Sequence, residues 1–458
     1  MFKVKNITIM KDYMEKEFSN NSKNGIVYFQ GKYHLNASQF AKLCLQHVHC
    51  VIFSDISKNV WIYNFKKGIY EQDSYRIRKL IFYFLNKIAK DAWNSRHIKE
   101  VFDMILLYSS EVTQLDKFNN NLIAFENCAF DTKSSVIIPH RFDNYLINSL
   151  PVKYIANEEC PLFIRFLYSI FEDSKTVEFV KEFFGYCLSN ETRAHKLLLN
   201  YGTGSNGKST LFKILQSIIG KDNVSSSSFR DMATDFGLEP LLAKKCNISN
   251  ESGSDFLNSE LLKSISSGDS VTVNRKNKEA IRQILPIKLI FIVNQLPLIK
   301  DESYGFERRV IILPFTKTFT ASDIDVHLEE KLLLERSGIL NFALEGLKSL
   351  KDRGYRFQES ESMLIAKKNY FGSSAPVKRF LKEKLEMKKG SKIEKNDLRQ
   401  AFVSWCDENN IDSRGFGSPR KFAKGMQEAY FSEHGHELQE VKHSHTRYYA
   451  SISYKNII

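Results

Sequence analysis

The 458-residue sequence lacks three features that would assign it to a familiar class. No run of about 18 apolar residues occurs, so no segment is expected to span a membrane. The seven cysteines are scattered and odd in number, which argues against a disulfide framework. The N-terminal stretch MFKVKNITIMKDYMEKEF is too charged for a signal peptide. These absences favour a reducing compartment, and we expect the cytoplasm.

One compressed group of metal-type side chains occurs near the N-terminus, in the stretch CLQHVHC. Cys44, His47, His49 and Cys50 are all residue types that bind zinc. Their spacing is tighter than the usual paired-ligand geometry, and both cysteines occupy positions where apolar residues would serve. We therefore favour ordinary packing over a zinc site.

The balance of charge is basic. Lysine and arginine number 66 against 53 aspartate and glutamate residues, a formal net charge of +13. This excess favours a polyanionic partner without identifying it. The 35 phenylalanines and 20 tyrosines would suit base stacking, although most aromatic residues in any folded chain are core.

The most specific motif lies in the middle of the chain. The apolar run 197–199 predicts a buried strand, a loop follows, and an apolar-periodic helix opens at Lys208. Gly202, Gly207, Lys208 and Ser209 match G-x-x-x-x-G-K-[ST], in which backbone N–H groups and lysine bind phosphates and serine ligates Mg²⁺. The motif predicts a site for ATP and Mg²⁺ at Gly202, Thr203, Gly204, Ser205, Asn206, Gly207, Lys208, Ser209 and Thr210.

Polar residues follow the next predicted strands. The strand 247–249 precedes Asn250 and Glu251, and the strand 288–293 ends at Asn294. A nucleotide hydrolase places the carboxylate that handles Mg²⁺ or water at such a strand end. Taken alone, Glu251 fits a solvated strand end equally well. A third strand, 310–313, follows the pair Arg308 and Arg309.

Taken together, these residues resemble the motifs of a known family. The spacing of the strand ends that carry Lys208, Glu251, Asn294 and a double arginine resembles that of superfamily III helicases, a branch of the AAA+ ATPases. Upstream, the turn at Asn127 and Asp131, the Cys160-Pro161 helix start and the helix ending at 185–188 resemble phage, plasmid and poxvirus primase-helicases. The likeness covers about residues 115–350 and extends to Rep initiators of staphylococcal pathogenicity islands.

The resemblance implies roles for the strand-end residues. Glu251 would be the second-motif acid and, with Ser209, a Mg²⁺ ligand, and Asn294 would be the polar sensor near the γ-phosphate. Arg309, with Arg308, would act as an arginine finger in the neighbouring subunit's site. Asn250 stands where relatives carry a first acid, so Asp255 is an alternative helper.

A basic hairpin is predicted between the acid and the sensor strand. Val271 and Val273 alternate toward a basic tip at 275–278. Such a charge run is commonly a solvated turn. In superfamily III helicases the similar hairpin lines a central pore and grips single-stranded DNA, which implies that Arg275, Lys276, Asn277 and Lys278 bind DNA.

The C-terminal region reads as a separate winged helix. Three helices are expected in 377–387, 397–410 and 419–431, and ELQEVKHSHTRYYASISY alternates like a two-stranded wing. Arg420, Lys421 and Lys424 on the third helix favour duplex DNA, together with Lys442, His443, His445 and Arg447 on the wing. The alternative is a protein-docking winged helix.

We therefore expect an α/β protein built on an AAA+ P-loop ATPase. Its regions are an N-terminal α/β module for assembly (1–115), a pre-ATPase region (116–195), the ATPase with a helical lid broken at Gly338 (196–350), a linker (351–376) and the winged helix (377–458). The N-terminal module shows no acid pair with histidine of the kind that a primase needs.

The expected function is that of an ATP-dependent DNA helicase and replication initiator of a mobile genetic element in the bacterial cytoplasm. By resemblance it forms a homo-hexamer, moves 3′ to 5′ on single-stranded DNA and binds duplex origin DNA. The alternative is a DNA-binding assembly or packaging-type ATPase without strand separation.

Overall fold

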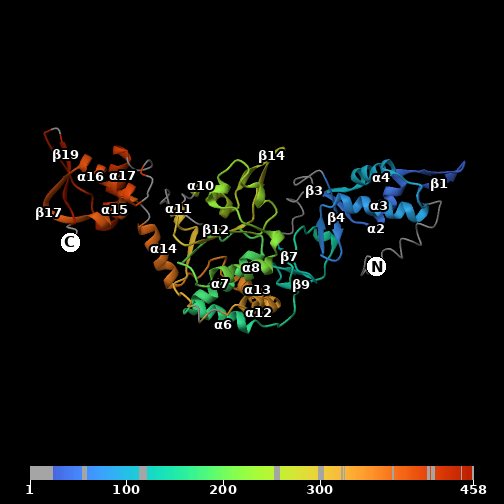
Figure 1. Ribbon diagram of the computed structural model, residues 1–458, viewed down its shortest axis with the longest axis horizontal. Helices are drawn as coiled ribbons and strands as arrows, with labels where there is room; N and C mark the ends of the chain where they lie inside the picture. Colours follow the sequence, from blue (N-terminus) through green and yellow to red (C-terminus); the bar gives the residue numbers. More distant parts are fainter. Residues whose placement is uncertain are drawn as a thin grey trace.

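The structure is a computed structural model of the whole chain, and Figure 1 shows the N-terminal and C-terminal elements at opposite ends of a central α/β unit. It describes residues 24–53, 59–112, 121–251, 258–297, 304–320, 323, 325–373, 376–409, 413, 418–444 and 446–455. No helix in this described part has the length and hydropathy that a membrane crossing requires.

A five-stranded parallel sheet forms the centre of the molecule. Its strand order is β11-β12-β15-β10-β16, with bounds β10 (Leu197–Tyr201), β11 (Val224–Ser225), β12 (Cys246–Glu251), β15 (Lys288–Val293) and β16 (Val310–Pro314). The predicted strands and the mixed α/β class are confirmed. Because every strand is parallel, all carboxyl ends meet at one edge of the sheet, where ligands of open α/β sheets bind.

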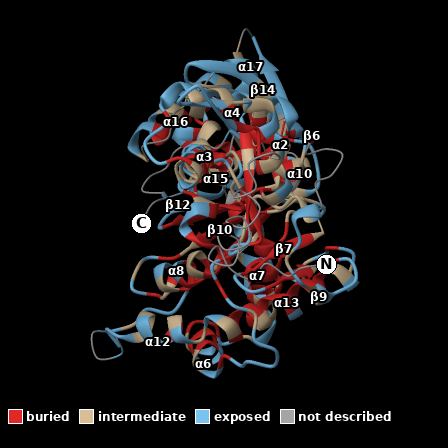
Figure 2. Cartoon of the chain, turned by 90° about the vertical axis from the view of Figure 1, so that its right-hand side faces the viewer, coloured by how far each residue is buried: buried red, intermediate tan, exposed pale blue. Residues whose placement is uncertain are grey.

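Alternate side chains of the sheet enter two cores. On β10, Leu198 belongs to one core, whereas Leu197 and Leu199 belong to the other. This period of two is the ordinary geometry of a strand that is buried on both faces. Figure 2 shows the burial concentrated at β10, α7 and α13.

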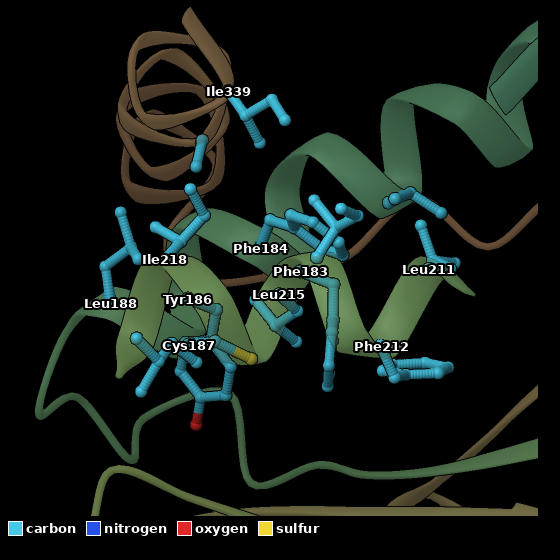
Figure 3. Packing of buried hydrophobic residues seen from close by; sticks show 14 of the residues in the cluster. Phe183, Phe184, Tyr186, Cys187, Leu188, Leu211, Phe212, Leu215, Ile218 and Ile339 are labelled. Carbon is cyan, nitrogen blue, oxygen red and sulfur yellow. The ribbon is translucent and has the colours of Figure 1, made fainter. Parts of the chain in front are cut away.

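The first core lies against α6 (Pro161–Ile170), α7 (Ser174–Leu188), α8 (Lys208–Ile219), α12 (Leu328–Leu334) and α13 (Arg336–Asp352). Figure 3 shows side chains of α7 and α8 packing together, with Ile339 of α13 above them. Both predicted helices after Cys160 are confirmed. The predicted helical lid is also helical, and its leucines Leu332, Leu340 and Leu344 are buried in this core.

Gly338 does not break the helix, contrary to the sequence prediction. The helical interruption falls at Glu335, and Gly338 lies inside α13. A Cβ atom at Gly338 would lie 2.1 Å from the carbonyl oxygen of Glu159. Similarly, a Cβ atom at Gly346 would lie 2.1 Å from the carbonyl oxygen of Lys181 on α7. These glycines therefore allow close backbone packing rather than ending a helix.

The second core covers the opposite face of the sheet. It contains residues of α9 (Phe229–Met232), α10 (Ser259–Ser267), α11 (Tyr304–Glu307) and the antiparallel hairpin of β13 (Ser270–Arg275) and β14 (Lys278–Ile284). The predicted hairpin is thus confirmed. Short 3₁₀ turns η2 (Lys221–Asn223) and η3 (Glu239–Leu241) flank β11 and β12.

Two buried lysines lie at the amino end of the sheet, beneath the end of α7. Lys245 Nζ donates to the carbonyl oxygen of Leu188 at 3.0 Å, and Lys288 Nζ donates to that of Ser189 at 2.9 Å. Burial lowers the pKa of Lys245 to about 7 and that of Lys288 to about 8.

The N-terminal elements form an α/β unit with its own core. Among its described residues, a four-stranded sheet of order β5-β4-β3-β6 accompanies three helices and a separate hairpin. The bounds are β1 (Ile26–Phe29), β2 (Lys32–Leu35), α2 (Ala37–His47), β3 (Cys50–Phe53), β4 (Val60–Asn64), β5 (Ile69–Glu71), α3 (Ser74–Ile88), α4 (Ser95–Tyr108) and β6 (Ser110–Val112).

A small meander connects this unit to the central sheet. It comprises β7 (Leu122–Ala124), β8 (Ala129–Asp131), β9 (Val136–Ile138) and the turn η1 (Phe142–Asn144). Tyr145 stacks on Tyr70, with ring centroids 6.0 Å apart, and Asn127 donates to the carbonyl oxygen of Tyr154. The meander therefore contacts β5 of the N-terminal unit.

The predicted linker 351–376 contains a helix, α14 (Glu361–Ser373). Tyr370 of this helix is buried in the second core, and its hydroxyl donates to the carbonyl oxygen of Pro297 at 2.6 Å. The exposed face of this helix accounts for the polar composition of the segment.

The C-terminal elements contain one strand that the sequence prediction missed. The helices are α15 (Pro376–Lys384), α16 (Lys395–Glu408) and α17 (Pro419–His434), and the sheet order is β17-β19-β18, with β17 (Leu385–Glu394), β18 (Glu440–His443) and β19 (Thr446–Tyr454). The first predicted helix therefore ends at Lys384. Leu385–Met387 instead pair with β19, a partner more than 60 residues away.

Candidate functional site

The loop between β10 and α8 has the backbone shape of a phosphate-binding turn. Gly204 and Gly207 have φ angles of 117° and 82°, and Ser205 lies at 46°. Successive residues with such dihedral angles turn backbone N–H groups toward a common point, which suits an anion. A Cβ atom at Gly202 would lie 2.5 Å from the carbonyl oxygen of Phe315, so glycine is required there for steric reasons.

Lys208 is the first residue of α8, at the positive end of the helix dipole. Its side chain is buried, and Nζ donates to the carbonyl oxygen of Gly202. Burial lowers the pKa of this lysine. Lys208 therefore places a positive charge at the N-terminus of α8, where the helix dipole also favours an anion.

The strand ends that carry the predicted polar residues lie level with the phosphate loop. Asn250 pairs in register with Ile292 and Glu251 with Val293, and the Gly202 N–H donates to the Val293 carbonyl oxygen at 3.3 Å. Asn294 directly follows β15. The structure therefore brings the backbones of these residues to one edge of the sheet. The side chain of Glu251, and Asp255 as a whole, lie outside the described residues.

A pocket of about 600 Å³ joins the loop to these strand ends. Among its predicted members are Gly204, Ser205, Asn206, Gly207, Lys208, Ser209, Thr210 and Asn294. Asn206 is 3% exposed, and its Nδ2 group has no hydrogen-bond acceptor among the described residues. A buried donor without a partner fits an oxygen-rich ligand such as a polyphosphate. The residues present therefore fit a nucleotide with its metal ion.

The opposite wall of this pocket was missed by sequence reasoning. It consists of Phe166 and Ser169 on α6 and the segment after β16, including Phe319, Asp325 and Val326. The Phe319 N–H donates to the Ser205 carbonyl oxygen at 2.7 Å and so returns this segment to the loop. Lys331, whose Nζ lies 2.7 Å from Asp325, lowers the pKa of that carboxyl. No local sequence pattern predicts that the segment after β16 folds back onto the phosphate loop.

Arg308 and Arg309 lie at the other end of the sheet. They precede β16, and the Leu197 N–H at the start of β10 donates to the Arg309 carbonyl oxygen at 2.9 Å. The five residues of β10 separate this point from Gly202, a path of roughly 16 Å at the usual rise per residue. The structure therefore does not bring Arg309 to the pocket of its own chain.

The Arg309 guanidinium is instead bound near the base of the β13–β14 hairpin. Nε and Nη2 donate to Ser267 Oγ at 3.1 and 2.8 Å, and Nη1 donates to the Gly305 carbonyl oxygen. Partial burial, with Arg308 nearby, lowers the pKa of Arg309.

The tip of this hairpin is basic and mostly exposed. Lys276, Asn277 and Lys278 are exposed, whereas Arg275 is half-buried and its Nε donates to the Glu279 carbonyl oxygen at 3.0 Å. Exposed Arg282 on β14 adds a positive charge that sequence reasoning missed. The tip therefore suits a phosphate backbone, which cations attract without reading sequence.

The predicted basic residues of the C-terminal unit also face solvent. Arg420, Lys421 and Lys424 are exposed on the first turns of α17, and Lys424 lies 3.7 Å from Glu428. On the β18–β19 hairpin, Lys442 pairs in register with Arg447, and His443 is exposed. His445 lies outside the described residues. Lys388 and Lys389 on β17 are also exposed, and they were not predicted.

The cysteines of the cysteine and histidine group near the N-terminus pack in the core of the N-terminal unit. Cys44 lies in α2 and Cys50 in β3, both are buried, and burial raises the pKa of Cys50 to about 12. The His49 ring stacks on Phe142 with centroids 3.7 Å apart. Within the described ranges, no three metal-type side chains gather closely enough to hold an ion.

Two family models match parts of the chain. Residues 78–172 match the model described as "D5 N terminal like", and residues 200–309 match a "Family of unknown function (DUF5906)". The second match begins within β10 and ends at Arg309, so it contains the phosphate loop, both strand-end asparagines and the hairpin.

Several viral proteins are similar to this chain. "Putative helicase L207/L206" of Acanthamoeba polyphaga mimivirus is 28% identical over 264 residues, which are 54% of this chain and 26% of that protein. "Putative helicase 121R" of Invertebrate iridescent virus 3 is 25% identical over 258 residues, 52% of this chain and 27% of that protein. The chain thus spans about a quarter of the length of these relatives.

Solved structures of the NrS-1 C-terminal region were also matched. An apo form is 14% identical, with 90% of this chain and 98% of that chain covered and a TM-score of 0.47. A second apo structure is 12% identical, with the same TM-score and coverage of 92% and 100%.

Proposed function

We propose that this chain is an ATP-dependent DNA helicase and replication initiator that assembles into a ring. The proposal rests on one observation: the predicted catalytic residues lie at two opposite ends of one sheet. The phosphate loop and the strand ends form a pocket at the carboxyl edge, whereas Arg309 lies roughly 16 Å away at the amino edge. Similarity to viral proteins named as helicases supports the same function.

The pocket residues divide the work of γ-phosphate hydrolysis. Lys208 binds the β- and γ-phosphates and stabilises the charge that develops as the phosphoryl group leaves. Asn206 Nδ2 donates to a phosphate oxygen, and Asn294 contacts the γ-phosphate or the attacking water. Glu251 orients that water. Mg²⁺, held by Ser209 and Glu251, would neutralise charge on the phosphate oxygens.

Arg309 completes the site of the next subunit. Its backbone lies too far from the phosphate loop of its own chain for an arginine side chain to reach, so an arginine finger at this position requires a second copy of the chain. Repeated around a closed ring, this head-to-tail contact gives a cyclic homo-oligomer, and we propose a hexamer. The AAA+ class and 3′ to 5′ movement belong to the same proposal.

Two DNA contacts follow from the basic surfaces. The β13–β14 tips, with Lys276 and Lys278, bind successive phosphates of one strand in the central pore. The C-terminal unit binds duplex origin DNA through α17, because three helices and a three-stranded sheet support a winged helix whose third helix suits the major groove. The source that we propose is a mobile genetic element.

The test measures ATP hydrolysis and strand separation in one preparation. Lys208→Ala should abolish both, because it removes the point charge from the transferred phosphate. Lys213→Ala is the matched control, since Lys213 lies on the same helix and pairs with Glu329 at 2.7 Å. Hydrolysis without strand separation in the wild-type protein would instead favour an assembly or packaging ATPase.

A further inference from the structure

The contacts of Arg309 connect it to the β13–β14 hairpin. Ser267 Oγ accepts hydrogen bonds from both Nε and Nη2 of the guanidinium, at 3.1 and 2.8 Å. An arginine side chain has five N–H donors. With Nη1 also bound to the Gly305 carbonyl oxygen, three donors are used, and two remain for another acceptor. The guanidinium is therefore fixed in orientation yet still able to bind a phosphate.

Ser267 lies at the base of the hairpin. It is the last residue of α10, and Gly268, with φ 74°, ends the helix in the left-handed conformation. The Asp269 N–H then donates to the Ser264 carbonyl oxygen at 2.9 Å, and β13 begins at Ser270. Only this tight turn separates the serine that holds Arg309 from the first strand of the hairpin.

The hairpin base and α10 are packed into one core. Val271 and Val273 of β13 are buried in the same cluster as Leu262 and Ile265 of α10. Close-packed interiors transmit displacement rather than absorb it. The exposed tip at Lys276 to Lys278 is thus connected to Ser267 through buried contacts, with no intervening flexible segment in the described chain.

We infer that Ser267 is a positioning residue that couples single-stranded DNA on the hairpin to the orientation of Arg309, and so regulates hydrolysis in the neighbouring subunit. The inference rests on the proposed function. DNA phosphates bind the tip, the hairpin and α10 move together, and the Ser267 hydroxyl moves the guanidinium with them. Arg309 contacts the nucleotide, whereas Ser267 acts through Arg309.

The experiment compares Ser267→Thr with Ser267→Val in the full chain. Threonine and valine have nearly the same shape and nearly the same effect on helix stability, but only threonine keeps the hydroxyl. ATP turnover is measured against the concentration of single-stranded DNA. We expect Ser267→Val to lower the DNA-stimulated kcat about tenfold, with the KM for ATP and the half-saturating DNA concentration within twofold of wild type.

The threonine variant should restore stimulation to within about twofold of wild type. Ser266→Ala is the matched control, because Ser266 Oγ donates to the Lys263 carbonyl oxygen of its own helix at 3.1 Å. If the β-branched variants do not fold, Ser267→Ala replaces Ser267→Val and is compared with wild type, because it lacks the hydroxyl without adding bulk.

Two failures are distinguishable. If Arg309→Ala loses activity but the variant without the Ser267 hydroxyl keeps full stimulation by DNA, the coupling role of Ser267 is wrong and the proposed function stands. If Arg309→Ala itself keeps wild-type turnover, the arginine finger of the proposed function is wrong.

Discussion

Arg309 provides the sharpest prediction, because its place in the sheet keeps it from the phosphate loop of its own chain, so the proposed arginine finger has to act between subunits. The Arg309 carbonyl oxygen bonds the first residue of β10, and the phosphate loop follows the last residue of that strand. At about 3.3 Å per residue the separation is roughly 16 Å. A finger that must contact a γ-phosphate directly cannot bridge this span within one chain.

The experiment mixes two variants, each of which is expected to be inactive alone. Lys208→Ala and Arg309→Ala should each lower ATP turnover by at least about 10³-fold, because each removes a positive charge from the transition state. In a random equimolar ring, a site works only where an intact Lys208 faces an intact Arg309. If sites act independently, about one quarter of them recover, so the mixture should show about a quarter of wild-type turnover.

The control mixes Lys208→Ala with the double variant Lys208→Ala, Arg309→Ala, which contains no intact Lys208 and should recover nothing. Subunit exchange is verified first by fluorescence transfer between labelled subunits. A mixture as inactive as its components, under conditions where exchange is complete, would refute the shared site.

The remaining predictions concern the acid, the two DNA contacts and one buried lysine. Glu251→Gln should bind ATP but turn over at least about 10²-fold more slowly, as measured by filter retention of bound nucleotide; unchanged turnover would assign the role elsewhere. Neutralising Lys276 and Lys278 should weaken single-strand binding with a shallower salt dependence while duplex origin binding persists. Deleting 377–458 should instead abolish duplex origin binding while single-strand binding persists. If the protein without 377–458 still prefers its origin, the element that recognises the origin lies elsewhere in the chain. The folded-state pKa of Lys245 is about 7, below the unfolded value, so the unfolded state binds more protons and stability rises with pH. Between pH 7 and 8.5, the free energy of unfolding of wild type should therefore rise by roughly 1–2 kcal/mol relative to Lys245→Met, and denaturant titrations showing no change would contradict this.

Local pattern predicted the elements of the central sheet well. The strand 288–293 and the helix from Lys208 have the predicted starts, because continuous apolar runs and helical periodicity are strong signals. The positions of Gly202 to Thr210 followed from the motif alone. Their grouping with Asn294 follows from a parallel sheet, whose carboxyl ends share one edge.

The features that the sequence did not predict share a physical cause, since each depends on contacts between residues that lie far apart in the sequence. β17 forms because its residues pair with β19, and the charged stretch around Lys388 shows no alternation of its own. Gly338 was interpreted as a helix break because the nearby backbone of Glu159 is invisible in a local pattern. The wall at Phe319 depends on contacts with residues far away in the sequence, among them the backbone hydrogen bond to Ser205.

Strand displacement on a forked DNA substrate tests the central claim most directly. The wild-type protein with ATP and Mg²⁺ should release the labelled strand, in parallel with DNA-stimulated ATP hydrolysis and a ring-sized mass in solution. A non-hydrolysable ATP analogue should support the ring but no release. Full ATP turnover on the same fork, with a ring assembled and no strand released, would contradict the helicase function.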